Sequence, residues 1–202
     1  MNRSVALRDA LRRSYHAARR AADDYQHPRR HLRALTRLRG LASCQRVLVV
    51  CHGNICRSPY LEAVLQRDLP NATISSAGFL RAERPVPENA RLVAAERGFD
   101  MSAFRSTTIT RSITAAADII IVMDARQAEQ VVRDLGAPAE RVVIAGDLDP
   151  ARGQRRAIRD PWNQPIEVFI ESFDRLDRCA TTLVGVLGQR ARTPAVALTG
   201  EG

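Results

Sequence analysis

The chain has 202 residues, 45% of them apolar, which is enough for one hydrophobic core of ordinary size. Its formal net charge is +9, yet residues 1–40 hold eleven arginines and only three acidic residues, so the rest of the chain is close to neutral. This distribution excludes a basic surface over the whole protein and predicts one folded domain with a basic N-terminal extension.

Membrane and secretory segments are not apparent. No stretch reaches the run of about 18 apolar residues that a membrane-spanning helix requires, and the first residues lack the apolar segment of a secretory signal. We therefore expect a cytoplasmic protein without a transmembrane segment. The four cysteines, Cys44, Cys51, Cys56 and Cys179, fit neither a disulfide framework nor the paired spacing of a zinc site. They are interpreted as thiols, and no metal or cofactor is predicted.

The basic extension comprises residues 1–42, where leucine and valine recur at loosely helical spacing until His27-Pro28 interrupts the pattern. We expect two marginal helices or disorder here, separable from the domain that follows. Three roles stay open: a solvated segment without a partner, contact with an acidic surface such as anionic lipid or an acidic tail, and nucleic-acid binding. The extension offers only Tyr15 and Tyr25 for stacking and has no docking motif, so specific nucleic-acid binding is not expected.

The first half of the domain begins with residues 46–51, RVLVVC, which are typical of a strand buried on both faces. A helical pattern then runs from Ser58-Pro59 to about residue 68, with serine in a capping position and proline at the first helical position. A second short strand is predicted at residues 73–76. A second helix is predicted at residues 87–97.

The second half contains the strongest strand signal, ADIIIVMD at residues 117–124, with one helix predicted before it and another at residues 126–135. Residues 141–145 are predicted to form a fourth strand, and residues 165–187 a long amphipathic helix. Strands that alternate with helices form parallel sheets through crossover connections. The predicted fold is a doubly wound α/β fold with a four-stranded parallel sheet and helices on both faces.

The loop after the first strand has the composition of an anion-binding site. It lies where a parallel strand ends and a helix begins, so unpaired N–H groups and the helix dipole favour a bound anion. Gly53 permits close backbone approach, and Asn54 tolerates left-handed geometry. Arg57 supplies a planar fork that matches two phosphoryl oxygens. The sequence therefore predicts a loop that holds a tetrahedral dianion.

Cys51 is the candidate nucleophile of this loop. It ends the strand beside the N–H groups and Arg57, which favour a thiolate and also stabilise a phosphoryl group as it transfers to sulfur. Either cysteine of the loop, taken alone, is more often a small buried hydrophobic residue. The combination with glycine, asparagine, Arg-Ser and a following proline favours catalysis.

The pattern C-x-G-N-x-C-R-S-P, filled without a gap from Cys51 to Pro59, is similar to the signature of the low-molecular-weight protein tyrosine phosphatases. The resemblance covers about residues 45–187 and divides the chain into the extension, a phosphatase domain at residues 43–190 and a flexible tail at residues 191–202. It implies that Ser76 supports the loop together with Asn54 and Ser58. The residues that it implies for phosphate binding are His52, Gly53, Asn54, Ile55, Cys56, Arg57 and Ser58.

The segment RDPWNQP, residues 159–165, resembles the acid loop of that family. By this resemblance Asp160 first protonates the leaving oxygen and then activates water, although alone it would pass for a turn aspartate. Trp162 stands where the family has an aromatic pocket wall, and a plain packing role for it is as well supported. Phe79 or Leu80 is expected on the opposite wall.

Arginines at positions 81 and 84 add positive charge at the pocket rim. The resemblance implies hydrolysis of protein phosphotyrosine, with a bacterial tyrosine kinase among the candidate substrates. It also suggests that Cys56 can trap an oxidised Cys51 as a reversible disulfide.

Two alternative functions remain: a module that binds phosphotyrosine without turnover, and an arsenate reductase on the same fold. The second is disfavoured because no cysteine lies between Cys56 and Cys179.

Overall fold

The computed structural model of the chain describes residues 3–41 and 44–191. Its centre is one sheet in which all neighbouring strands are parallel, in the order β2-β1-β3-β4. The strands are β1 (Arg46–Cys51), β2 (Thr73–Gly78), β3 (Ile119–Val122) and β4 (Val142–Ile144). The predicted four-stranded parallel sheet is confirmed. The predicted tail after residue 191 lies outside the described residues.

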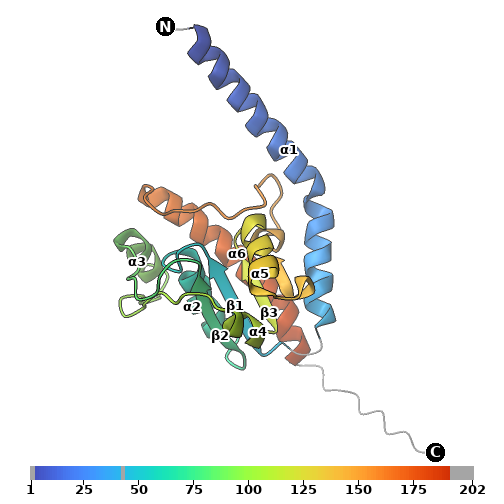
Figure 1. Ribbon diagram of the computed structural model, residues 1–202, viewed down its shortest axis with the longest axis vertical. Helices are drawn as coiled ribbons and strands as arrows, with labels where there is room; N and C mark the ends of the chain where they lie inside the picture. The colour runs from blue at the N-terminus through green and yellow to red at the C-terminus, as the bar shows by residue number, and fades with distance from the viewer. Residues whose placement is uncertain (1–2, 42–43, 192–202) are drawn as a thin grey trace, which may run out of the picture.

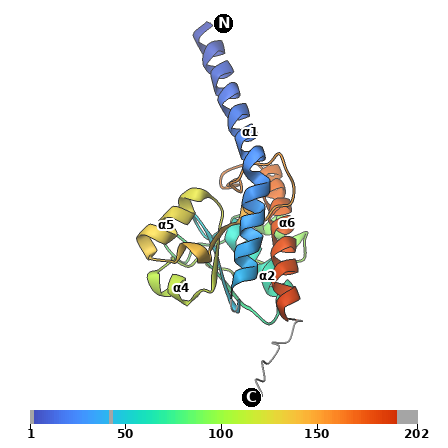
Figure 2. The same ribbon diagram turned by 90° about the vertical axis from the view of Figure 1, so that its right-hand side faces the viewer.

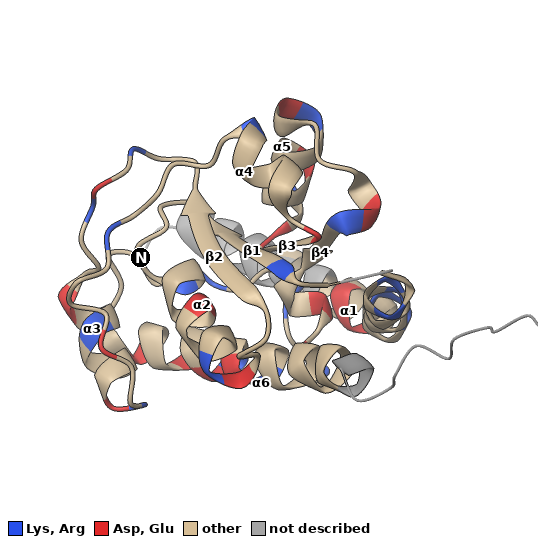
Figure 3. Cartoon of the chain, turned by 90° about the horizontal axis from the view of Figure 1, so that it is seen from below, with Lys and Arg blue, Asp and Glu red and all other residues tan. Residues whose placement is uncertain are grey.

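Helices cover both faces of this sheet, as the view in Figure 3 shows. Helices α4 (Arg111–Ala116) and α5 (Ala125–Leu135) lie on one face, and α2 (Arg57–Asp68) and α6 (Ile166–Ala191) lie on the other. Helix α3 (Glu88–Ala95) packs beside α6. The three-layer arrangement predicted from the alternation of strands and helices is therefore present. None of the helices in the described part combines the length and apolarity needed to cross a bilayer.

The side chains of β1 explain why both faces are covered. Val47, Val49 and Cys51 belong to the apolar cluster under α2 and α6. Leu48 and Val50 belong to the separate cluster under α5. Because successive side chains of a strand point to opposite faces, an unbroken apolar run can be buried only between two layers of helices.

Helix α2 begins at Arg57, two residues before Pro59, the predicted first helical residue, and Cys56 precedes it. The prediction that Ser58 caps this helix is therefore wrong, since Ser58 lies inside the first turn and its hydroxyl donates to the sulfur of Cys51. The expected cap geometry is found at α5 instead, where the Asp124 carboxylate accepts a hydrogen bond from the backbone N–H of Gln127 at 2.8 Å.

The extension forms a single helix, α1 (Arg3–Gly40), and the expected interruption at His27-Pro28 is wrong. Pro28 lies within the helix, which changes direction near its middle, as prolines inside helices commonly cause (Figure 1). The first half projects from the body, and the second half lies alongside α6 (Figures 1 and 2). Ala34 and Leu38 of the second half are buried in the main core, so this part of the extension is not a separate, solvated segment.

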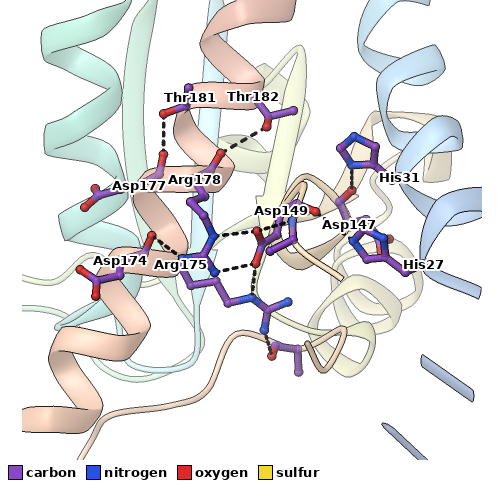
Figure 4. Close-up of polar contacts among 12 residues, drawn as sticks. His27, His31, Asp147, Asp149, Asp174, Arg175, Asp177, Arg178, Thr181 and Thr182 are labelled. Atoms are coloured by element: carbon purple, nitrogen blue, oxygen red, sulfur yellow. Dashed lines mark hydrogen bonds and ion pairs between the residues drawn. The ribbon is translucent and has the colours of Figure 1, made fainter. Parts of the chain in front are cut away.

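Polar contacts attach α1 to the turn that follows β4 (Figure 4). The ring of His27 donates from Nε2 to the carbonyl oxygen of Asp149 at 2.9 Å, and that of His31 donates from Nδ1 to the carbonyl oxygen of Asp147 at 2.8 Å. A carbonyl oxygen only accepts, which makes each ring nitrogen the donor. Arg30 Nε lies 3.3 Å from the Asp147 carboxylate. The extension is thus joined to the segment that leads to the predicted acid loop.

The carboxylate of Asp149 is fully buried and forms the centre of this contact region (Figure 4). It accepts hydrogen bonds from Arg178 Nε at 2.9 Å and from Arg175 Nε at 2.9 Å, both on α6. Burial by itself raises the pKa of Asp149, but the hydrogen bonds from Arg178, the Ala151 N–H and Arg175 outweigh it and hold this pKa below its ordinary value. The carboxylate is therefore charged and paired in the folded protein.

Replacing the carboxylate in Asp149→Asn should lower the free energy of unfolding at pH 7 by about 3 kcal/mol, because it leaves the buried guanidinium of Arg175 without its counter-charge. The folded-state pKa lies below the unfolded value near 4, so this stabilisation is complete above about pH 4 and disappears as the pH falls through the folded-state pKa. Urea unfolding across this pH range measures both effects. The control is Asp134→Asn, because Asp134 forms an exposed ion pair with Arg133. Equal stability of the two variants at pH 7 would contradict the assignment.

Candidate active site

The loop from Cys51 to Ser58 connects the central strand β1 to α2 at the carboxyl edge of the sheet. A pocket of about 180 Å³ opens there. Its lining comes from this loop, from the segment after β2 and from the predicted acid loop: Cys51, His52, Gly53, Ile55, Cys56, Arg57, Leu80, Arg84, Asp160 and Trp162. Three segments that are distant in sequence therefore meet at the end of β1.

The sulfur of Cys51 is held by two donors. The backbone N–H of Asn54 donates to it at 3.2 Å, and the hydroxyl of Ser58 donates to it at 3.0 Å. Cys51 is buried but lines the pocket. Two donors aimed at one sulfur stabilise negative charge on it, both when the sulfur attacks as a nucleophile and when it departs as a leaving group.

Asn54 holds the loop in shape through its side-chain amide. Its backbone has φ 51°, in the left-handed region that asparagine tolerates. Its nitrogen Nδ2 donates to the hydroxyls of Ser58 at 2.9 Å and Ser76 at 2.7 Å, while its Oδ1 accepts from the Thr107 N–H at 2.7 Å. The predicted contact of Ser76 with the loop asparagine is confirmed. A side chain at Gly78 would lie 2.7 Å from the Asn54 nitrogen, so this position requires glycine.

Glu62 is a supporting residue that the sequence interpretation missed. The hydroxyl of Ser76 donates to Glu62 Oε2 at 2.5 Å. Because the Ser76 hydrogen is used in this bond, the lone pairs of the Ser76 oxygen accept the hydrogen bond from Asn54. Burial raises the pKa of Glu62, and the hydrogen bond from Ser76 opposes this shift. Glu62 lies four residues after Ser58 and so on the same face of α2, which is a signal visible in the sequence.

Arg57 and Asp160 meet at the other side of the pocket. Arg57 is almost fully buried and donates from Nη1 to the carbonyl oxygen of Ile158 at 3.0 Å and from Nη2 to Asp160 Oδ2 at 2.5 Å. The second carboxylate oxygen of Asp160 accepts from the Trp162 N–H at 3.2 Å. The structure thus brings together the three predicted catalytic side chains, Cys51, Arg57 and Asp160, in one pocket.

Part of the pocket wall is apolar and partly exposed. Trp162 and Leu80 line the pocket and are 46% and 38% exposed. Phe79, the other candidate for this wall, packs instead against the apolar cluster under α5, and its backbone N–H donates to the carbonyl oxygen of His52 at 2.9 Å. The assignment of Phe79 to the substrate pocket is therefore wrong. Phe79 packs on the α5 side of the sheet, whereas its neighbour Leu80 lines the pocket.

The remaining cysteines occupy different surroundings. Cys56 lines the pocket beside Cys51, and burial raises the pKa of its thiol. Both are free thiols, so their redox pairing stays a prediction. Cys179 is buried in the core on α6, and Cys44 is partly exposed. Neither of these two lines the pocket.

The family model that describes low molecular weight phosphotyrosine protein phosphatases matches residues 46–193. The chain belongs to this family. The resemblance inferred from the loop signature is confirmed, and the matched region begins at β1, so α1 lies outside it.

Individual members of the family match about two thirds of this chain and most of their own length. The probable low molecular weight protein-tyrosine-phosphatase EpsP of Ralstonia nicotianae is 33% identical over 133 residues, which cover 65% of this chain and 88% of that protein. The low molecular weight protein-tyrosine-phosphatase Wzb of Escherichia coli K12 is 31% identical over 135 residues, which cover 66% of this chain and 89% of Wzb.

Solved structures of relatives cover a similar share of the chain. The tyrosine phosphatase AmsI of Erwinia amylovora has a TM-score of 0.67 at 28% identity and covers 72% of this chain and 95% of its own. The YwlE arginine phosphatase of Geobacillus stearothermophilus has a TM-score of 0.66 at 26% identity, with 72% and 94% covered. The fold is therefore shared by phosphatases whose names specify different phosphorylated side chains.

Changes at Glu62 test the hydrogen-bond chain that reaches the sulfur. Glu62→Ala removes the acceptor of the Ser76 hydroxyl, so turnover of p-nitrophenyl phosphate should fall about tenfold, as expected for loss of one buried hydrogen bond. Glu62→Gln keeps an oxygen acceptor and should retain most of the activity. The exposed Glu129 on α5, changed to Ala, controls for loss of a helix carboxylate. Equal losses in the Ala and Gln variants of Glu62 would show that its charge, and not its acceptor, matters.

Proposed function

We propose that this chain hydrolyses phosphotyrosine in proteins through a phosphocysteine intermediate at Cys51. The observation that carries the proposal is the convergence of the Cys51 sulfur, the Arg57 guanidinium and the Asp160 carboxyl group on one pocket. A nucleophile, a cation for phosphoryl oxygens and a proton donor are the three groups that cysteine-dependent ester hydrolysis requires.

The first step transfers the phosphoryl group to sulfur. The Cys51 thiolate attacks phosphorus, the S–P bond forms, and the bond between phosphorus and the tyrosine oxygen breaks. Asp160 gives its proton to this oxygen, so tyrosine leaves as the neutral phenol. Arg57 and the N–H groups of the loop hold the oxygens of the transferring group, where negative charge is spread in the transition state.

The second step releases phosphate. Asp160, now a carboxylate, takes a proton from a water molecule while the water oxygen attacks phosphorus, and the S–P bond breaks. The electron pair returns to the Cys51 sulfur, where hydrogen bonds from the Ser58 hydroxyl and the Asn54 N–H stabilise the negative charge. The enzyme is then restored with Cys51 as thiolate and Asp160 protonated.

The pocket walls favour an aromatic phosphate ester. Trp162 offers a ring face, and Leu80 offers an apolar surface, at the mouth of a narrow pocket that a phenyl ring can occupy. The guanidinium of Arg84 lies over the Trp162 ring at 5.6 Å, so a phosphoarginine side chain would bring a second guanidinium toward a cation. This supports phosphotyrosine over phosphoarginine.

The substrate we propose is a phosphotyrosine protein, and a bacterial tyrosine kinase that carries its own phosphotyrosine is a candidate. A binding module without turnover needs neither a cysteine under two donors nor an aspartate beside the arginine, and both are present here. An arsenate reductase that relays a disulfide needs cysteines downstream of the loop that can reach the site. The one cysteine after Cys56 in the sequence is Cys179, which lies in the core.

Two substitutions test the mechanism. Cys51→Ser should reduce turnover of p-nitrophenyl phosphate by at least about 10³-fold, because the hydroxyl is a poor nucleophile without a base. Asp160→Asn should slow phenyl phosphate by about 10²-fold and p-nitrophenyl phosphate by less, because nitrophenolate leaves without a proton.

Steady-state rates with the two esters measure both effects, and Cys44→Ser outside the pocket is the control. Substantial turnover by Cys51→Ser, or equal slowing of both esters in Asp160→Asn, would refute the assigned roles.

A further inference from the structure

Arg84 is a cation of the pocket wall that takes no part in the two chemical steps. It lies between β2 and α3, in a loop that Ser106 holds in place. The Arg84 N–H donates to the Ser106 hydroxyl at 3.0 Å, its carbonyl oxygen accepts from the Ser106 N–H at 3.0 Å, and the Glu83 N–H donates to the Ser106 carbonyl oxygen at 2.8 Å. Because Ser106 is buried, the backbone of Arg84 has a defined position beside the site.

The side chain of Arg84 lies between an aromatic ring and the phosphate-binding loop. Its guanidinium carbon lies 5.6 Å from the centre of the Trp162 ring, which is within cation–π distance. A Cβ atom at Gly53 would lie only 3.2 Å from Arg84 Nη1, so this nitrogen is packed against the loop backbone. The guanidinium therefore has a fixed place at the mouth of the pocket.

The charge of Arg84 has no partner within the described part of the chain. Its Nη1 is buried and makes no hydrogen bond there, and none of its side-chain nitrogens takes part in an ion pair. Asp160 is the one acid among the described lining residues, and it pairs with Arg57. Leaving a buried donor without an acceptor is unfavourable. Because the guanidinium is also charged and unpaired among the described residues, an anionic acceptor suits this wall best.

We propose that Arg84 is a specificity-determining residue that binds a second anionic group, carried by the side chain next to the phosphotyrosine in the substrate. This inference rests on the proposed function, and it defines the preferred substrate as phosphotyrosine flanked by an acidic or phosphorylated residue. The phosphate that is transferred has Arg57 and the loop N–H groups as ligands. Arg84 stands beside the wall that contacts the tyrosine ring, where residues adjacent to that tyrosine emerge from the pocket.

The recognised group is an anion, and a carboxylate and a phosphoryl group both fit a guanidinium fork. Binding at the pocket mouth should act on substrate affinity, so it should appear in KM more than in kcat. High salt should weaken the preference, because the mouth is open to solvent and charges there are screened.

The test compares four substrates: p-nitrophenyl phosphate and three phosphotyrosine peptides that differ only beside the phosphotyrosine, with alanine, glutamate or a second phosphotyrosine. In the full-length chain, we expect the glutamate peptide to exceed the alanine peptide in kcat/KM. In Arg84→Ala this ratio should fall about tenfold, mainly through KM. Arg84→Gln keeps hydrogen-bond donors but not the charge, and it should lose the preference as well. Because this variant preserves most of the side chain, the same loss in both variants could not be due to a folding defect of the Ala variant.

The control is Arg81→Ala, an exposed arginine of the same loop that does not line the pocket, and it should keep the ratio. The arm with a second phosphotyrosine shows whether a phosphoryl group is preferred to a carboxylate. A proportional loss on all four substrates in Arg84→Ala would overturn the proposal and assign Arg84 to the transferred phosphate. A wild-type ratio near one would overturn it too, whereas a wild-type chain that turns over none of the four would refute the proposed function itself.

Discussion

The hydrogen bonds around the Cys51 sulfur depend on Asn54. Its backbone N–H contacts the sulfur directly, and its side-chain amide joins two serines that lie on α2 and β2. The left-handed backbone of Asn54 turns the loop so that the Asn54 N–H points at the sulfur, and Gly78 on the neighbouring strand leaves room for this turn. Loop, strand and helix are thereby held in one arrangement, which the electrostatics of phosphoryl transfer require before substrate binds.

The opposite side of the pocket depends on contacts that are distant in sequence. Asp160 follows a long segment after β4, and this segment is held by Arg175 of α6, which donates to the Ala157 carbonyl oxygen and to Asp149. Helix α1 adds contacts from His27 and His31 to the start of the same segment. The matched family region begins only at β1, so this chain supplements the shared fold with a helix that packs on its core.

Local patterns were sufficient to predict the strands, the phosphate-binding loop and its cysteine, because an apolar strand run and a Gly-Asn turn are determined within a few residues. The placement of α1 could not be predicted, since the partners of His27 and His31 lie more than a hundred residues away. The error at Phe79 has a simpler origin. Strand β2 ends at Gly78 and not at residue 76, and the alternation at its end sends Phe79 to the α5 face and Leu80 to the pocket.

In the proposed mechanism, the Cys51 sulfur carries the phosphoryl group during turnover. Rapid mixing of the Asp160→Asn variant with p-nitrophenyl phosphate, followed by acid quenching, proteolysis and mass spectrometry, detects the modified residue. The variant lacks the base for the second step, so one phosphoryl group should accumulate on Cys51, in an amount equal to the initial burst of nitrophenol. A burst without phosphorylated Cys51, or with the phosphoryl group on another residue, would contradict the claim.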